Sequence, residues 1–293
     1  MDLQVFLTVA KAGSMGRAAE ALHTVQSNVT TRVQALEREL GAVLFRRHSR
    51  GVTLTEAGQR LLPFAEQISQ LTVAARQAVA DDGTPAGTLG IGSLETTAAL
   101  RLPPVLAAFA GANPAVDLTL VTETSEWLVS EVLARRLEGA FVAGPVRHRD
   151  LAEEVVFEEE LVLITPLTMR TIEALGRQRA LKMVVFRAGC AYRHRLEAWL
   201  ARRGLVGVRR LDSGTVDGIV GCVAAGIGIS LLPRAVVAGA VAAGRVAAHA
   251  LPAGEGRVDT VFIRRQDGHV SSALAAFLAA VRGAAMLRLR AAE

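Results

Sequence analysis

Residues 26–32 combine short hydrogen-bonding side chains with one cation, inside a stretch whose apolar residues recur at helical spacing. The intervals between these apolar residues are four, three and four positions, which predicts one buried helix face. They are Val29, Val33, Leu36 and Leu40. The opposite face carries Gln26, Ser27, Asn28, Thr30, Thr31 and Arg32. Gln and Asn can bond adenine, and Ser or Thr can bond several bases, so this face suits base edges in the major groove of DNA.

A run of arginines follows this helix. Val43-Leu44-Phe45 leads into the run and Val52-Thr53-Leu54 follows it, which predicts a two-stranded hairpin with Arg46, Arg47 and Arg50 near its tip. Arginines there can reach phosphates or enter a narrow minor groove. Residues 1–60 hold 8 Lys and Arg against 5 Asp and Glu, whereas the rest of the chain holds 25 against 23. The basic density therefore lies at the N-terminal end, where a phosphate-contacting surface is expected.

Two helices are expected before the polar face. Residues 2–11 carry apolar side chains at helical spacing, and so does the segment from Ser14 to Leu22. Ser14 can accept a hydrogen bond from the free N–H groups of a first helical turn. Gly41 stands where a glycine commonly ends a helix. These patterns predict a trihelical core that presents residues 26–32 on its surface.

A longer helix is expected from the N-cap residue Thr55 to about Val79, with a bend at Pro63. Its apolar residues recur every seven positions with others between them, which predicts a short coiled-coil seam. The residues of the seam are Leu61, Phe64 or Ala65, Ile68, Leu71, Ala75 and Ala78. Such a helix needs a partner, which is either a second copy of the chain or its own C-terminal domain.

In this region the sequence resembles the N-terminal winged helix-turn-helix of the LysR-type transcriptional regulators. The matching residues follow one another in order from the start of the chain. They are Phe6, Ala10, Gly13, Ser14, Arg17, Ala18, Ala19, Leu22, Gln26, Ser27, Val29, Thr30, Leu36, Glu37, Leu40, Gly41, Leu44, Phe45, Arg46, Arg47, Leu54, Thr55 and Gly58. The chain departs from the commonest family pattern at Met15-Gly16 and at Thr31-Arg32, which leaves the exact operator open.

The resemblance implies a regulator that binds double-stranded DNA at a pseudo-palindromic operator. Base and phosphate contacts are expected from the second helix, through Gln26, Ser27, Thr30, Thr31 and Arg32. Backbone or minor-groove contacts are expected from the wing, through Arg46, Arg47 and Arg50. In this family the linker helix pairs two subunits, so a homodimer or homotetramer is expected, with activator or repressor action left open.

The pattern changes at residues 81–87, which gather Gly, Pro and acidic residues without an apolar period and so mark a boundary. From Thr88 on, strand and helix patterns alternate, which predicts mainly parallel sheets covered on both faces. Strands are expected over 88–92, 116–122, 140–143, 160–165, 182–186, 208–211, 228–232 and 259–264.

This C-terminal part resembles the effector domain of the same family, which looks like a periplasmic binding protein with two α/β lobes. The landmarks are Gly90-Ile91-Gly92, Leu102-Pro103, residues 160–164 and residues 225–233. The expected fold is therefore α/β, with a winged helix-turn-helix domain at 1–58, a linker helix and hinge at 59–87, and an effector-binding domain at 88–293. Lobe I is expected at 88–163 and 266–293, and lobe II at 164–265.

Ligands of open α/β sheets bind beyond the carboxyl ends of the strands, where helix N-termini offer free N–H groups to anions. The polar residues expected at such places are Ser93, Glu95, Thr96, Thr124, Ser125, Cys190, Tyr192 and Thr215. Hydroxyls and backbone amides favour an effector with a carboxylate or another anionic group. Glu95 favours an amine-bearing effector, so both classes stay open. Each of these residues is equally suited to ordinary helix capping.

The sequence gives catalysis little support. His, Cys, Asp and Glu do not recur at metal-ligand spacing, and the glycines of residues 88–92 lack the third glycine of a dinucleotide motif. We therefore expect no catalytic residue, metal or cofactor. Two alternatives stay open. One is a redox-responsive regulator acting through Cys190 and Cys222, as in peroxide-sensing members of the family. The other is a solute-binding protein without a DNA role, which would leave residues 1–60 unexplained.

Two cysteines among 293 residues are too few for a disulfide framework and fit a reducing compartment. The N-terminus has Asp2 and an amphipathic pattern instead of a basic stretch followed by an apolar run, so no secretion signal is expected. The longest uncharged stretch, residues 218–233, has 16 residues and three internal glycines, which is too short and broken to span a bilayer. A cytoplasmic protein without a membrane partner is expected.

Overall fold

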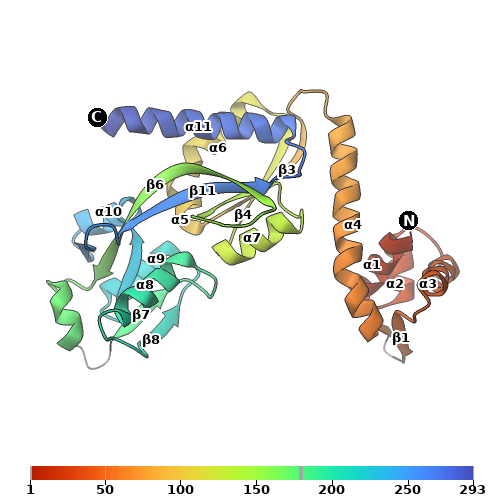
Figure 1. Ribbon diagram of the computed structural model, residues 1–293, viewed down its shortest axis with the longest axis horizontal. Helices are drawn as coiled ribbons and strands as arrows, with labels where there is room; N and C mark the ends of the chain where they lie inside the picture. Colours follow the sequence, from red (N-terminus) through yellow and green to blue (C-terminus); the bar gives the residue numbers. More distant parts are fainter. Residues whose placement is uncertain (1, 50, 178–180, 293) are drawn as a thin grey trace. The chain divides into compact units, whose positions relative to one another are not determined.

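The computed structural model describes residues 2–49, 51–177 and 181–292, and the chain divides into two units, Met1–Ala80 and Asp81–Glu293. The first unit contains α1 (Asp2–Ala12), α2 (Met15–Ala21), α3 (Gln26–Leu40), β1 (Phe45–His48), β2 (Gly51–Leu54) and α4 (Glu56–Ala80). In Figure 1 it is the part drawn from red to orange. The expected three helices, hairpin and long helix are confirmed.

The helix ends in the first unit follow from single residues. The Ser14 hydroxyl accepts a hydrogen bond from the Arg17 backbone N–H at 3.5 Å and so caps α2. Gly41 ends α3 with a φ of 63°, a conformation that costs a glycine nothing. Phe6 and Val29 are fully buried between the three helices. The helical spacing of the apolar residues therefore closes a trihelical core, as expected, but the prediction that Leu40 belongs to it is wrong, because this last residue of α3 is 47% exposed.

The wing is anchored at its root by a carboxylate of α3. The Glu37 side chain accepts hydrogen bonds from the backbone N–H groups of Leu44 at 2.7 Å and Phe45 at 3.3 Å. On the other strand, Val52 N–H donates to the Gly13 carbonyl at 3.0 Å. Strands β1 and β2 pair antiparallel between these two anchors. The hairpin is thus fixed to the helices at its root and again beside its turn, while Arg46 and Arg47 remain exposed.

The second unit contains the remaining elements (Figure 1). They are β3 (Gly87–Ser93), α5 (Glu95–Leu100), α6 (Leu102–Ala112), β4 (Val116–Thr122), α7 (Ser125–Leu133), β5 (Gly139–Ala143), β6 (Leu151–Thr165), the short 3-10 helix η1 (Ile172–Arg177), β7 (Lys182–Val185), α8 (Ala191–Ala201), β8 (Arg209–Asp212), α9 (Val216–Ala224), β9 (Ser230–Pro233), α10 (Arg234–Ala242), β10 (Ala247–Ala250), β11 (Arg257–Arg265) and α11 (Ser272–Ala292). The main sheet has the order β10-β6-β11-β5-β3-β4, with β9 also pairing β6, and β7 pairs β8 separately.

The prediction of mainly parallel sheets is wrong for this unit. Strands β3–β4, β3–β5 and β7–β8 are parallel, but β6 and β11 are antiparallel to each other and to every other strand that they pair with. The reason is that the chain passes between the lobes twice in opposite directions. In Figure 1 the long arrows of β6 and β11 run side by side through the unit.

Strand β6 belongs to both lobes. Its residues 151–160 pair with β11, and its residues 161–165 pair with β9 and β10. Strand β11 also pairs with β5, in the part of the sheet that contains β3. The sequence-based limits put residues 257–265 in lobe II, whereas this pairing puts them with lobe I. The pairing therefore favours crossing points near residues 160 and 256 over those predicted at 163 and 265.

Each lobe has its own buried cluster, and a further cluster, which includes Leu128 and Trp199, contains residues of both lobes. In lobe I, aromatic rings from β5, α6, β11 and α11 pack together, with the Phe109 and Phe277 centroids 5.3 Å apart and those of Phe141 and Phe262 5.0 Å apart. In lobe II, Val184 of β7 and Ile219 of α9 pack against residues of β6 and β9. Among the residues that the structure describes, no helix is both long and apolar enough to cross a membrane.

The start of the second unit is fixed by one carboxylate. Asp81 accepts hydrogen bonds from the Ser272 backbone N–H at 2.8 Å and the Gly83 N–H at 3.1 Å, and its other contact is His269 Nε2 at 2.9 Å. The hydrogen bonds from His269 and Ser272 hold the pKa of Asp81 well below its usual range. Asp81 thus attaches the segment that follows α4 to the N-terminus of α11.

A substitution at Gly58 tests how closely α4 packs against the wing. A Cβ at Gly58 would lie 2.3 Å from the Leu44 carbonyl oxygen and 2.9 Å from a Leu54 methyl. We expect Gly58→Ala to destabilise the first unit by about 1–3 kcal/mol, the usual cost of overpacking. Calorimetric unfolding of the full chain measures it. Gly16→Ala in α2 is the matched control, because its Cβ would meet nothing closer than 3.5 Å and should be neutral or stabilising. Equal stability of both variants would contradict the packing account.

Candidate functional site

The polar face of α3 is open to solvent. Gln26, Ser27 and Thr31 are exposed and Thr30 is half-buried. The Thr31 hydroxyl donates to the Ser27 carbonyl at 2.9 Å, which fixes its rotamer along the helix. Arg32 is half-buried, and its Nε donates to the Asp2 carboxylate of α1 at 2.8 Å. The face that sequence periodicity predicted is therefore present, and Arg32 lies at its edge with an intramolecular partner.

The wing carries exposed arginines beside a buried anchor. In β1, Phe45 is buried whereas Arg46 and Arg47 are exposed. Successive side chains of a strand point to opposite faces, so these two arginines project on either side of the hairpin. The prediction for Arg50 falls outside the described residues.

Helix α4 carries an exposed apolar stripe. Phe64 is 62% exposed, Ile68 49% and Leu71 53%, at spacings of four and three residues, and Ala75 continues the row. Ala65 is buried on the side that faces the first unit's own core. The stripe is therefore not covered by its own unit. This is the arrangement expected of a coiled-coil seam that pairs with another helix.

The second unit contains a cleft between its lobes. Its cavity has a volume of about 60 Å³ and opens to solvent, so a ligand larger than a few water molecules needs the cleft to widen. Lobe I lines it with Leu94, Glu95, Thr96, Thr122, Glu123 and Thr124. Lobe II lines it with Phe186, Arg187, Cys190, Tyr192, Ser213 and Gly214. These residues follow the carboxyl ends of β3, β4, β7 and β8, as the rule for open α/β sheets predicts.

Side chains of the two lobes meet across the cleft at two points. The hydroxyls of Thr96 and Tyr192 lie 3.5 Å apart, and Arg187 Nη1 donates to Glu123 Oε1 at 3.4 Å. Glu123 is further held by the Thr124 backbone N–H, which donates to its other oxygen at 3.2 Å. Both polar contacts between side chains are long and therefore weak, whereas buried apolar residues of the two lobes also share one cluster.

Burial keeps two groups of the cleft neutral. It raises the pKa of the Tyr192 phenol to about 12, against the opposing effect of its hydrogen bond with Thr96. Burial also raises the pKa of the Cys190 thiol, which disfavours the reactive thiolate. Cys222 packs in a different cluster, on α9. These surroundings favour a structural thiol at Cys190 over the redox alternative.

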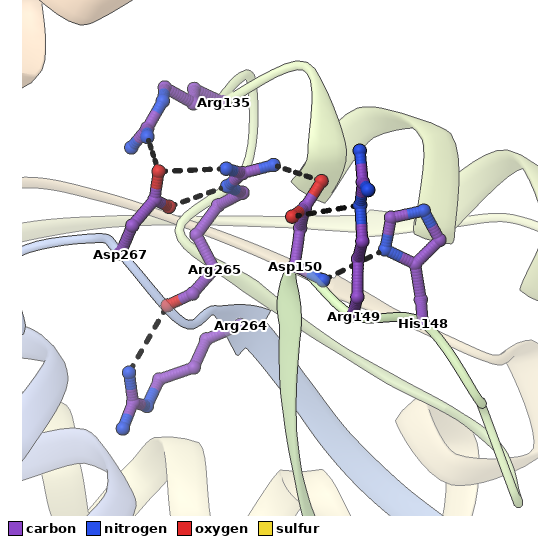
Figure 2. A network of polar contacts seen from close by, with 7 residues as sticks. All are labelled: Arg135, His148, Arg149, Asp150, Arg264, Arg265 and Asp267. Carbon is purple, nitrogen blue, oxygen red and sulfur yellow. Dashed lines mark hydrogen bonds and ion pairs between the residues drawn. The ribbon is translucent and has the colours of Figure 1, made fainter.

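A charged network away from the cleft holds the ends of the crossing strands. Arg265, at the end of β11, donates to both oxygens of Asp267 at 2.8 Å, and Asp267 also accepts from Arg135 at 2.7 Å (Figure 2). Arg265 lies 3.7 Å from Asp150, directly before β6. The pKa of Asp267 is lowered to about 2, chiefly by Arg265. The network ties the entry of β6 to the exit of β11.

Comparison with known proteins finds a matching family model for each of the two units. Residues 1–59 match the family model described as "Bacterial regulatory helix-turn-helix protein, lysR family", and residues 82–286 match that described as "LysR substrate binding domain".

The chain belongs to the LysR family.

Among curated relatives, it is similar to the transcriptional regulator GltR of Bacillus subtilis, with 44% identity over 96% of this chain and 95% of GltR. It is also similar to CzcR of Bacillus thuringiensis subsp. konkukian, with 40% identity over 94% of each chain. A crystal structure of full-length CbnR with its target DNA covers 97% of this chain and 98% of CbnR at 26% identity, with a TM-score of 0.64. The protein is a LysR-type DNA-binding transcriptional regulator with an effector-binding domain, and its curated relatives are regulators too.

The cleft of this LysR-type regulator contains some of the predicted effector residues and not others. Those that line it are Glu95, Thr96, Thr124, Cys190 and Tyr192. Ser93 is buried and its hydroxyl donates to the Leu94 carbonyl, Ser125 accepts from the Ala143 N–H, and Thr215 caps α9. These three side chains therefore serve local structure.

Sequence reasoning missed Glu123 and Arg187, the charged pair of the cleft. Each stands immediately after a strand or its expected end, which is the position of the residues that were identified. That position was the available signal. Isolated charges at strand ends are usually solvated, so this position alone does not single them out.

Tyr192 gives a direct optical test of the closed cleft, because it is the single tyrosine of the sequence. Phenolate absorbance of the full chain should titrate with a midpoint near pH 12 in place of the ordinary ~10. Since the folded pKa is raised, the protonated phenol contributes stability fully below about pH 10, and that stability is lost as the pH rises towards 12. Circular dichroism would verify that the chain stays folded. A midpoint near 10 in the folded chain would show that Tyr192 is solvated.

Proposed function

We propose that α3 and the wing of each subunit read one half of a pseudo-palindromic operator. Gln26, Ser27, Thr30 and Thr31 would contact base edges, because they present donors and acceptors on one exposed helix face. Asp2 orients Arg32 through its Nε, which leaves the end of that guanidinium directed to a phosphate. Arg46, Arg47 and Arg50 would contact the backbone or the minor groove. The target-DNA complex of CbnR, 26% identical, supports this use of the fold.

Two copies of the chain would pair through α4. The observation that carries this proposal is the exposed row Phe64, Ile68 and Leu71, because water-exposed apolar side chains at coiled-coil spacing are stabilised by a second helix. A twofold pair places two recognition helices on a twofold sequence, either as a homodimer or within a homotetramer. Because its operator is DNA, the protein would work in the cytoplasm.

The cleft would bind the effector, a small molecule with a carboxylate or an amine. Its lining residues come from both lobes, so a bound molecule contacts lobe I and lobe II at once. Such a ligand favours the lobe arrangement to which it binds more tightly, and it can shift the regulator only by that difference in affinity. The expected domain limits, 1–58, 59–87 and 88–293, assign one role to each segment: DNA reading, pairing and sensing.

DNA-binding measurements on single variants distinguish residues that contact phosphates from residues that contact bases. In mobility-shift titrations with the chain's own upstream region, Arg46→Ala should weaken binding to all sequences and reduce the salt slope by about one. Gln26→Ala should weaken operator binding by about 1–3 kcal/mol and non-operator binding little. Arg234→Ala, in the second unit, is the control. No fragment bound at moderate salt, together with no effect of Arg46→Ala, would contradict the DNA-binding proposal and favour a solute-binding protein.

Pairing through α4 is tested by placing a charge in the apolar row. Leu71→Glu should raise the subunit dissociation constant at least about tenfold in analytical ultracentrifugation, because an unpaired carboxylate would be buried in the seam. The fold should persist, since Leu71 is 53% exposed within its own chain. Gln77→Glu adds the same charge on α4 away from the row and should leave association unchanged. Identical association of the two variants would show that the row is not the interface.

A further inference from the structure

The cleft contains charges of both signs. Lobe I contributes the carboxylates of Glu95 and Glu123, and lobe II contributes the guanidinium of Arg187. The Tyr192 and Cys190 groups are neutral, since burial raises both pKa values. The described residues that line the cleft therefore offer two anionic groups and one cationic group to a ligand. This pattern is specific enough to narrow the chemistry of the effector beyond a carboxylate or an amine.

Glu123 and Arg187 neutralise each other across the cleft through one contact. Arg187 Nη1 lies 3.4 Å from Glu123 Oε1, and their side chains are 67% and 30% exposed. Ion pairs this exposed contribute little stability, so a ligand can separate the two groups at little cost. The pair thus marks two adjacent positions, one for an anion beside Arg187 and one for a cation beside Glu123.

A ligand with a single charge that binds one member of the Glu123–Arg187 pair would leave the other member without its partner. A plain carboxylate bound to Arg187 would free Glu123, with Glu95 as a second carboxylate nearby. A plain amine bound to Glu123 would free Arg187. A charge that is left unpaired while a ligand excludes water is costly. A ligand with both charges close together replaces the internal ion pair by two ion pairs of its own.

We propose that the effector is a zwitterion of the α-amino acid class, with its carboxylate on Arg187 and its ammonium group on Glu123 and Glu95. Ser213 lies in the same lining, and its hydroxyl, which donates to the Thr215 carbonyl at 3.4 Å, would turn to donate to the carboxylate instead. Leu94, Phe186 and the ring of Tyr192 supply apolar surface for the side chain of the amino acid. This inference rests on the proposed role of the cleft as the effector site and names the chemistry of that effector.

A binding panel with the full chain tests the class. Thermal shift followed by calorimetry would compare the standard L-amino acids with two matched sets, the same molecules without the amine and the same molecules without the carboxylate. At least one amino acid should bind, and both of its matched analogues should bind at least about tenfold more weakly, since each lacks one charge-assisted hydrogen bond.

Variants of Glu123 and Arg187 show which of the two residues binds the ammonium group of the ligand and which binds its carboxylate. Glu123→Gln should reduce the affinity for the amino acid by roughly 10- to 100-fold and have little effect on its analogue without the amine. Arg187→Gln should reduce the same affinity and have little effect on the analogue without the carboxylate. Arg234→Gln is the matched control, because the Arg234–Glu160 pair is similarly exposed and lies outside the cleft lining. It should leave every affinity unchanged.

The results of these experiments can refute the zwitterion assignment without refuting the proposed role as a regulator. If a plain acid or a plain amine binds as tightly as any amino acid, or if no amino acid binds, the zwitterion assignment is wrong. Equal effects of Glu123→Gln on an amino acid and on its analogue without the amine would also overturn it. Mobility shift of the upstream DNA, measured on the same samples, decides independently whether the regulator proposal stands.

Discussion

The effector-binding unit depends on the shared strand β6. Its first part hydrogen-bonds to β11 within lobe I, and its last residues hydrogen-bond to β9 and β10 within lobe II. Because a strand gives its backbone groups to its neighbours, each lobe is fixed to the same piece of chain. The register of β6 with β11 shifts between Thr260 and Val261, close to the crossing. The cleft follows from this connectivity, since strands ending on either side bring their following loops together.

The interactions on the two sides of this strand differ in strength. Near the crossing, Arg101 donates to both oxygens of Glu159 at 2.8 and 2.9 Å, and both side chains are largely buried. Removing one partner of such a pair leaves an uncompensated buried charge, which is strongly destabilising. Across the cleft, by contrast, the contacts of Thr96 with Tyr192 and of Arg187 with Glu123 are long. The polar contacts across the cleft are therefore weaker than those that build the lobes, and a small ligand that replaces them can change the balance between lobe arrangements.

The first unit was predictable because its determinants are local. Ser14, Gly41 and the helical spacing of apolar residues act over a few positions and appear directly in the sequence. The second unit was less predictable because its determinants are distant. Residues 151–159 form the first half of β6, yet their many glutamates resemble a solvated segment, and they become a strand only because β11, about a hundred residues later, pairs with them. Tertiary pairing also explains why β10, an alanine-rich segment, was not expected.

The central claim is that occupancy of the cleft changes operator binding. The direct measurement is reciprocal linkage: operator affinity with and without a bound cleft ligand, and ligand affinity with and without the operator fragment. Two coupled sites must change each other's dissociation constants by the same factor, typically about 5- to 150-fold. The ligand and the operator should change each other's dissociation constants by equal factors that differ clearly from one. These factors should fall towards one when Glu123 and Arg187 are both replaced by Gln. Ligand and operator that bind with affinities independent of each other would contradict it.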